Sequence, residues 1–171
     1  MFKKYLFILV STIYTVTVWG QSESSDYYDI RLKKLLDSEK INYTINKNNN
    51  FRINVITEEE PNERTQIVLM YSRTTTYSDF EIREITSAGL KIKKKDIKNS
   101  VLFSLLVQNG DLKIGSWEIQ EYNDDDENIL IAFSIKVSTN IPAKNLVSLM
   151  HLVANEADRV EKLYGSGADD F

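Results

Sequence analysis

The sequence predicts an α+β fold: an antiparallel sheet with its helices on one face, in the order α-β-β-β(-β)-α-β-β-α. Three observations predict this class. Apolar residues recur with helical spacing in three segments, the strand-like segments between them come in consecutive groups, and the connections are short and polar. Strands grouped in hairpins beside segregated helices are typical of α+β domains. The 171 residues, 42% of them hydrophobic, suit one domain with its own core.

The first helix is predicted to end near Glu39. Its apolar positions recur at i, i+4, i+7 and i+8, which places them on one helical face: Tyr28, Leu32, Leu35 and Leu36. The side chain of Ser24, Ser25 or Asp26 is expected to cap the first turn, because its oxygen can accept the unpaired N–H groups there.

Four strands are predicted next. INYTI (41–45) and FRINVI (51–56) alternate apolar and polar residues, and the asparagines between them tolerate the left-handed backbone of a tight turn. QIVLMYSR (66–73) is more continuously apolar, which favours a central position. SDFEIREITSAG (78–89) alternates and is predicted as the fourth strand.

The run KIKKKD (91–96) is expected to lead into a second helix that Asn109 and Gly110 terminate. The predicted inner face of that helix contains Ile97, Val101, Leu102, Leu105 and Leu106. A strand LKIGSWEIQEY (112–122) follows, and Gly115 inside it indicates a bulge or a close backbone approach.

NDDDEN (123–128) is predicted as a turn into the strand ILIAFSIKV (129–137). Thr139 or Asn140 is expected to cap the last helix, with Pro142 in its first turn, where a missing N–H costs nothing. One long apolar face is predicted for this helix, formed by Leu146, Leu149, Met150, Val153, Ala157, Val160 and Tyr164.

Residues 1–20 have the layout of a secretory signal peptide: the basic start MFKK, an apolar stretch, and small residues at Val18 and Gly20 before Gln21. The apolar run 5–19 is shorter than the roughly 20 residues that cross a bilayer, which argues against a membrane anchor. We therefore predict a signal peptide at 1–20, a single domain at 21–164 and a flexible acidic tail at 165–171. The chain is expected to be exported, to the periplasm or outside the cell, as a soluble protein.

Composition excludes several classes of function. The chain has no cysteine, which rules out disulfides, a thiol nucleophile and cysteine-bound zinc. Its formal charge of −4 becomes −6 when Lys3 and Lys4 leave with the signal peptide. Because nucleic acid affinity comes mainly from Lys and Arg on phosphates, we expect no nucleic acid partner.

No catalytic constellation is evident, so we predict that the chain is not an enzyme and has no cofactor or metal. Neither of the glycine patterns that bind phosphates occurs. The acidic residues of Asn123–Asn128 offer oxygen ligands for Ca²⁺, although a solvated turn explains them as well. His151, the single histidine, is expected on a helix surface. A small-ligand or calcium-binding protein and a carboxylate-dependent hydrolase remain as alternatives.

Trp117 and Tyr122 are the candidate interaction surface. If they project outward, they suit a recognition surface, because aromatic side chains are enriched at interface cores. Burial beneath a helix is the other interpretation, and the register around Gly115 leaves both open.

Several segments, taken together and in order, resemble the YbjN-type family, whose fold is that of the type III secretion chaperones. They are FRINV (51–55), QIVLMYSR (66–73), LLVQNG (105–110), KIGSWEIQ (113–120), ILIAFSIKV (129–137) and the helix at 146–165. Asn109 and Gly115 match positions where the family tends to have these residues. The resemblance extends over about 30–171 and implies dimerisation and binding of protein segments. The expected function is therefore an exported, chaperone-like or regulatory protein-binding module, with a protein partner or a homodimer.

Overall fold

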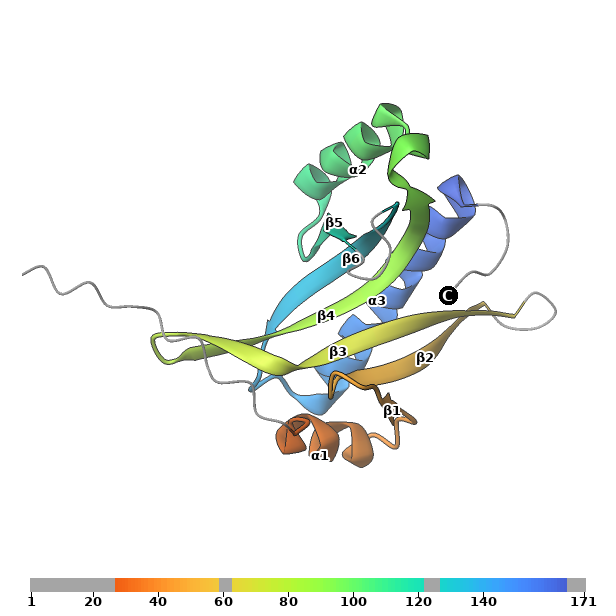
Figure 1. Cartoon of the computed structure of the whole chain (residues 1–171). Coiled ribbons are helices and arrows are strands. Elements are labelled where there is room, and N and C mark those ends of the chain that lie inside the picture. Colours follow the sequence, from red (N-terminus) through yellow and green to blue (C-terminus); the bar gives the residue numbers. More distant parts are fainter. Residues whose placement is uncertain (1–26, 59–62, 122–126, 166–171) are drawn as a thin grey trace, which may run out of the picture.

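The computed structural model describes residues 27–58, 63–121 and 127–165 (Figure 1). These residues form α1 (Ile30–Ser38), β1 (Thr44–Ile45), β2 (Phe51–Glu58), β3 (Arg64–Tyr77), β4 (Phe80–Lys93), a 3₁₀ turn η1 (Lys94–Asp96), α2 (Asn99–Asp111), β5 (Ser116–Glu121), β6 (Asn128–Ser138) and α3 (Ala143–Tyr164). The predicted α+β class and element order are confirmed. Of the described helices, none is long and apolar enough to cross a membrane.

The strands form one six-stranded antiparallel sheet in the order β1-β2-β3-β4-β6-β5. The long strands β4 and β6 pair from Ile82 opposite Ser138 to Lys93 opposite Asn128. The segment that contains α2 and β5 is thus inserted between two strands that are neighbours in the sheet. This order makes β5 an outer strand, with β6 on one side only.

The core lies between the sheet and α3, which runs along one sheet face in Figure 1. Alternate residues of the strands point toward α3, so that Phe51, Val68, Ile85 and Phe133 are fully buried. The expected apolar face of α3 packs onto them over most of its length, and five of its residues are buried: Leu146, Met150, Val153, Ala157 and Val160. Leu149 is only half-buried, and Tyr164, which was expected on this face, is 37% exposed. Leu32 and Leu36 of α1 extend the core at one end, as their spacing predicts.

Several predicted boundaries are wrong. Asp29, rather than an earlier residue, caps α1, and α3 begins after Pro142 without a side-chain cap. Lys91 and Lys93 belong to β4, and Gly110 lies within α2, which ends at Asp111. The predicted strand at 41–45 is reduced to the two residues of β1. The two strand limits depend on hydrogen-bond pairing across the sheet, which local residue preference alone does not report.

Three predictions concern residues outside the described ranges. They are the signal peptide at 1–20, Tyr122 together with most of the turn 123–128, and the acidic tail beyond Gly165.

Candidate interaction surface at helix α2 and strand β5

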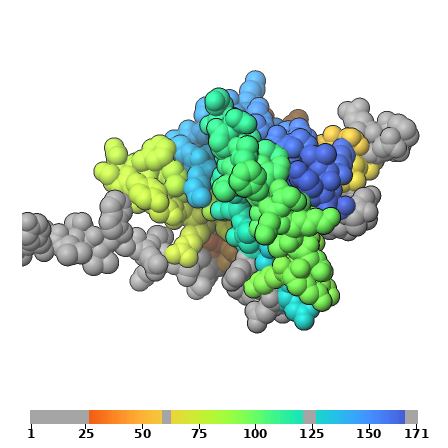
Figure 2. Space-filling view, turned by 90° about the horizontal axis from the view of Figure 1, so that it is seen from above, coloured from red at the N-terminus to blue at the C-terminus, as the bar shows by residue number. Residues whose placement is uncertain are grey.

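Helix α2 exposes large apolar side chains on its outer side. Phe103, Leu106 and Val107 are 70%, 67% and 53% exposed, whereas Leu105 of the same helix is buried. Figure 2 views the molecule from above and shows α2, in green, at the centre of this face. Leu106 was expected on the inner face, which is wrong. The helix therefore has an apolar side toward the sheet and a second apolar side toward solvent.

Strand β5 and the segment before it add further apolar surface. Ile119 of β5 is half exposed, and Ile114 is also exposed. We call the set Phe103, Leu106, Val107, Ile114 and Ile119 the α2–β5 patch. Leu106 and Ile119 line one cavity, which connects the helix and strand parts of the patch. Exposed apolar residues that lie together mark interaction sites more often than isolated ones do.

A cavity of about 230 Å³ lies between α2 and β5. Its lining is mostly apolar and consists of Leu102, Leu105, Leu106, Asn109, Trp117, Glu118, Ile119 and Ile131. Leu106 and Ile119 belong both to this lining and to the patch. The cavity therefore opens where the patch is, and it can accept an apolar group.

Asn109 in the last turn of α2 binds the backbone of β5. Its Oδ1 accepts a hydrogen bond from the Trp117 N–H at 2.7 Å, and its Nδ2 donates to the Trp117 carbonyl at 3.1 Å. The side-chain amide thus pairs with Trp117 as a residue of a neighbouring strand would. It fixes α2 against the outer side of β5 and closes the strand edge at that residue.

Trp117 is buried, with 6% of its surface exposed, so burial is the correct one of the two interpretations that the sequence left open. Its ring packs on Phe133, with ring centroids 5.3 Å apart, and reaches over Gly89 of β4. A Cβ at Gly89 would lie 3.0 Å from Cζ3 of Trp117, so the glycine provides the space for this ring. Trp117 therefore forms the floor of the surface instead of its outer face.

Gly115 lies just before β5 and adopts a left-handed φ of 81°. A Cβ there would be 2.6 Å from Cζ of Phe133 and 2.9 Å from the Ser134 carbonyl oxygen. The predicted close backbone approach is confirmed, although the residue precedes the strand. It turns the chain from α2 into β5 and thereby directs Trp117 inward.

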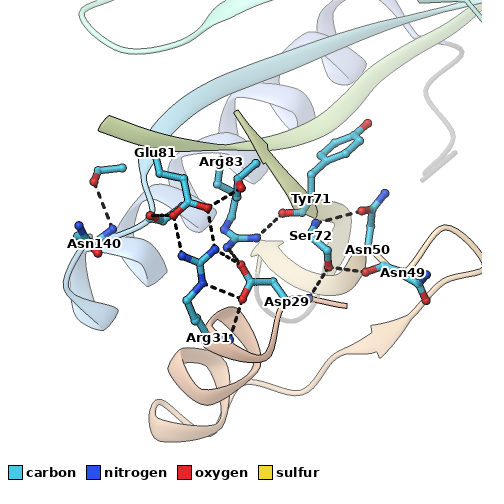
Figure 3. Close-up of polar contacts among 12 residues, drawn as sticks. Asp29, Arg31, Asn49, Asn50, Tyr71, Ser72, Glu81, Arg83 and Asn140 are labelled. Atoms are coloured by element: carbon cyan, nitrogen blue, oxygen red, sulfur yellow. Dashed lines mark hydrogen bonds and ion pairs between the residues drawn. The ribbon is translucent and has the colours of Figure 1, made fainter. Parts of the chain in front are cut away.

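A polar cluster joins α1 to β3 and β4 (Figure 3). Arg31 donates two hydrogen bonds to Glu81, and Arg83, only 4% exposed, donates to Asp29 and to the Tyr71 carbonyl. Burial alone would raise the pKa of Asp29, but the hydrogen bonds from Arg31 and Arg83 hold it well below its usual range. Because each described charge here has a partner, the cluster is a structural clamp.

A second ionic cluster fixes α3 to β3. Arg64 donates to Asp158 at 2.7 Å and to Glu161 at 2.6 Å, and Gln66 also donates to Glu161. Both carboxylates are buried, so these hydrogen bonds compensate for their lost hydration. This cluster is again structural.

Glu84 and Glu118 lie on the sheet face opposite α3, because their neighbours Ile85 and Trp117 point toward α3. Burial raises the pKa of Glu84, and the charge of Glu118 raises it further, while Lys136 opposes the shift. Oε1 of Glu118 is buried without a hydrogen-bond partner among the described residues. This pair is the arrangement closest to the carboxylate-dependent alternative.

The remaining candidate residues stay apart from these groups. His151 is exposed on α3, as expected. Lys93 lies 3.9 Å from Glu127, and the Lys94 N–H donates to the Glu127 carbonyl, so the lysine run contacts Glu127. Within the described ranges, no group of three or more His, Cys, Asp or Glu could hold a metal ion.

Sequence alone did not identify the α2–β5 patch or the role of Asn109. Asn109 was interpreted as a helix terminator, whereas its side chain binds a strand. The available signal was a helix with no charged residue from Asn99 to Gln108. A helix that is apolar on more than one side is stable in water only when each apolar side packs against another surface.

No protein-family model matches this chain, and no curated protein matches its sequence. The chain is similar in structure to YbjN of E. coli, known from a crystal structure, with 9% sequence identity and a TM-score of 0.39. The similarity covers 75% of this chain and 89% of YbjN. A similarity of this degree assigns the chain to no family and carries no conclusion about function.

Proposed function

We propose that this chain is an exported, non-enzymatic protein-binding module, chaperone-like or regulatory, that binds its partner at the α2–β5 patch. The observation that carries the proposal is the outward exposure of Phe103, Leu106 and Val107 on one side of α2. Burying apolar surface stabilises a complex by about 25 cal/mol per Å² before ordering costs. Three large side chains beside a cavity are thus a strong source of affinity.

A protein segment, or a second copy of the chain, is the partner that suits this surface. An apolar helix side next to an outer strand offers both side-chain contacts and backbone hydrogen bonds. The cavity beneath Leu106 and Ile119 would accept one large apolar side chain of the partner. The buried Trp117 below it gives that side chain a rigid aromatic floor.

Export is the second part of the proposal and rests on residues 1–20. Their basic start, apolar middle and small residues before Gln21 are the features that a signal peptidase requires. A mature domain without cysteine needs no disulfide formation after export, because its core and its two ionic clusters hold it together.

Two alternatives have specific support. The acidic turn 123–128 would suit calcium, and a thermal shift with Ca²⁺ that Asp124→Asn and Asp126→Asn abolish would favour that function. The partly buried pair Glu84 and Glu118 would suit a carboxylate-dependent hydrolase. Loss of a hydrolytic activity in Glu84→Gln, with the fold unchanged, would favour the second.

The test is capture of tagged 21–171 from its native cell envelope with cross-linking, followed by titration of the captured partner. We expect Phe103→Ser and Leu106→Ser each to weaken binding at least about tenfold, as central apolar contacts do. Phe80→Ser is the matched control, because Phe80 is 54% exposed but lies on the β3–β4 hairpin. Equal binding by all three variants would show that the patch is not the site.

A further inference from the structure

A second cavity, of about 200 Å³, lies on the side of α2 that faces α3. It is formed where the end of β4, the start of α2 and the last turn of α3 meet. Figure 2 shows the start of α2, in bright green, next to the end of α3, in dark blue. Ile131 of β6 lines both this cavity and the one beside β5, so α2 covers this end of the sheet with a space on each side.

Most of the lining of this second cavity is apolar, and Leu90, Ile97, Val101 and Leu163 contribute to it. Leu163 is 60% exposed although it lines the cavity, so a bound apolar group would remove part of its surface from water. An apolar cavity of about 150 Å³ holds benzene, so a space of this larger size suits an alkyl chain of roughly six to eight carbons. The cavity therefore accepts one short apolar chain.

The mouth of this second cavity carries positive charge. Lys98 lines it and is exposed, and within the described ranges no carboxylate forms an ion pair with Lys98. Asp96 is the single acidic residue of the lining, but the run 91–98 contains five lysines, whereas the whole chain has a formal charge of −4. Helix α2 begins directly after Lys98 without a side-chain cap, and the positive end of its dipole also favours an anion. The mouth therefore favours a negatively charged group next to the apolar space.

We propose that this second cavity binds a free, single-chain anionic amphiphile, with its carboxylate at Lys98 and its alkyl chain against Ile97, Val101 and Leu163. The inference goes beyond the proposed function, because it uses the α3 side of α2 and leaves the α2–β5 patch open. The hydroxyl groups of Ser104 and Tyr164 lie 3.2 Å apart and already connect α2 to α3. A bound alkyl chain adds apolar contacts between the same two helices.

Calorimetric titration of the full mature chain with octanoate, octylamine and octanol tests the head group, because the three ligands share one alkyl chain. We expect octanoate to bind at least about tenfold more tightly than the other two, as one charge-assisted hydrogen bond provides. Added salt should reduce this preference. Lys98→Glu should abolish the preference, and Asp96→Asn should strengthen octanoate binding severalfold. Equal affinities for the three ligands would overturn the anionic assignment.

Variants that fill one cavity at a time test the location. We expect Val101→Phe to abolish octanoate binding, whereas Leu102→Phe, which adds bulk to the cavity beside β5, leaves it unchanged. Circular dichroism checks that both variants fold, and the exposed positions Lys98 and Asp96 decide the question if Val101→Phe does not. Phe103→Ser should bind octanoate normally, which separates this site from the α2–β5 patch.

Three results would overturn the inference. They are the absence of octanoate binding, binding that Leu102→Phe abolishes and Val101→Phe does not, and binding only to vesicles of phosphatidylglycerol. The last result would indicate a membrane surface in place of a free amphiphile.

Discussion

Arg83 donates a hydrogen bond of 2.6 Å to Oδ2 of Asp29, a residue that lies 54 positions earlier in the chain. The guanidinium of Arg83 is 4% exposed and the carboxylate of Asp29 is 8% exposed. The pair therefore lies away from solvent, and each charge compensates for the hydration that the other has lost. Asp29 also caps α1 through the Arg31 N–H, so one carboxylate connects the helix to the sheet.

We expect Asp29→Ala to reduce the free energy of unfolding by about 3 kcal/mol or more, because it leaves a buried guanidinium without its partner. Loss of the helix cap adds to this effect. Urea denaturation measures it. Asp37→Ala is the control, since that carboxylate forms an exposed pair with Lys33 and its removal should change stability far less. Equal effects of both substitutions would contradict a buried clamp.

The same cluster predicts a loss of stability in acid. The hydrogen bonds from Arg31 lower the pKa of Glu81 from its ordinary 4.5 to about 2, and burial opposes them. A carboxyl group whose pKa is lower in the folded state stabilises the fold above its unfolded pKa. That stability is lost as the pH falls from about 5 toward 2.

Urea midpoints measured across this pH window provide the test. We expect Glu81→Gln to be less stable than the unaltered chain at neutral pH and to show a flatter pH dependence. Glu39→Gln, outside the cluster, should keep the original slope. If the urea midpoint of Glu81→Gln fell with pH as steeply as that of the unaltered chain, Glu81 would not be a source of the acid sensitivity.

Alanine substitutions at two glycines are expected to change the stability of the fold in opposite directions. Gly115→Ala should destabilise the fold by about 1–3 kcal/mol, because φ is 81° and a Cβ would collide with Phe133. Gly110→Ala should stabilise it by up to about 1 kcal/mol, since the residue is helical and has open space around it. Thermal denaturation of the two variants side by side gives the comparison.

Export predicts a mature chain that begins at Gln21. Mass spectrometry of the protein purified from the envelope or the medium should show loss of residues 1–20, and with them Trp19. The mature chain then contains Trp117 alone, whose burial predicts a blue-shifted fluorescence that moves to longer wavelength on unfolding. An intact N-terminus in the native protein would contradict export with cleavage.

Periodicity predicted the parts of the fold that depend on one continuous core face. The buried side of α3 and the inward residues of β2 and β6 follow from helical and strand repeats, because each of these elements packs against one neighbouring layer. Leu106 departs from this rule. It has helical spacing with Leu102 and Leu105, yet it borders a cavity and faces solvent.

Periodicity could not predict contacts between residues that are distant in the sequence. Nothing local to Asp29 indicates Arg83, and nothing local to Asn109 indicates that its amide pairs with Trp117. Both contacts depend on the strand order, which brings β4 to α1 and places β5 on the outside. The candidate surface follows from that order, so it emerged only with the structure.

The sheet order also bears on how the chain reaches its native state. Strand β5 is made before β6, yet β6 is the strand that it pairs with, and β6 in turn needs β4. During synthesis, β5 therefore stays without the strand that it pairs with until residues 128–138 have been made. The apolar side chains of α2 and β5 stay exposed throughout that interval and can aggregate, so chaperones that bind nascent chains should bind this segment first.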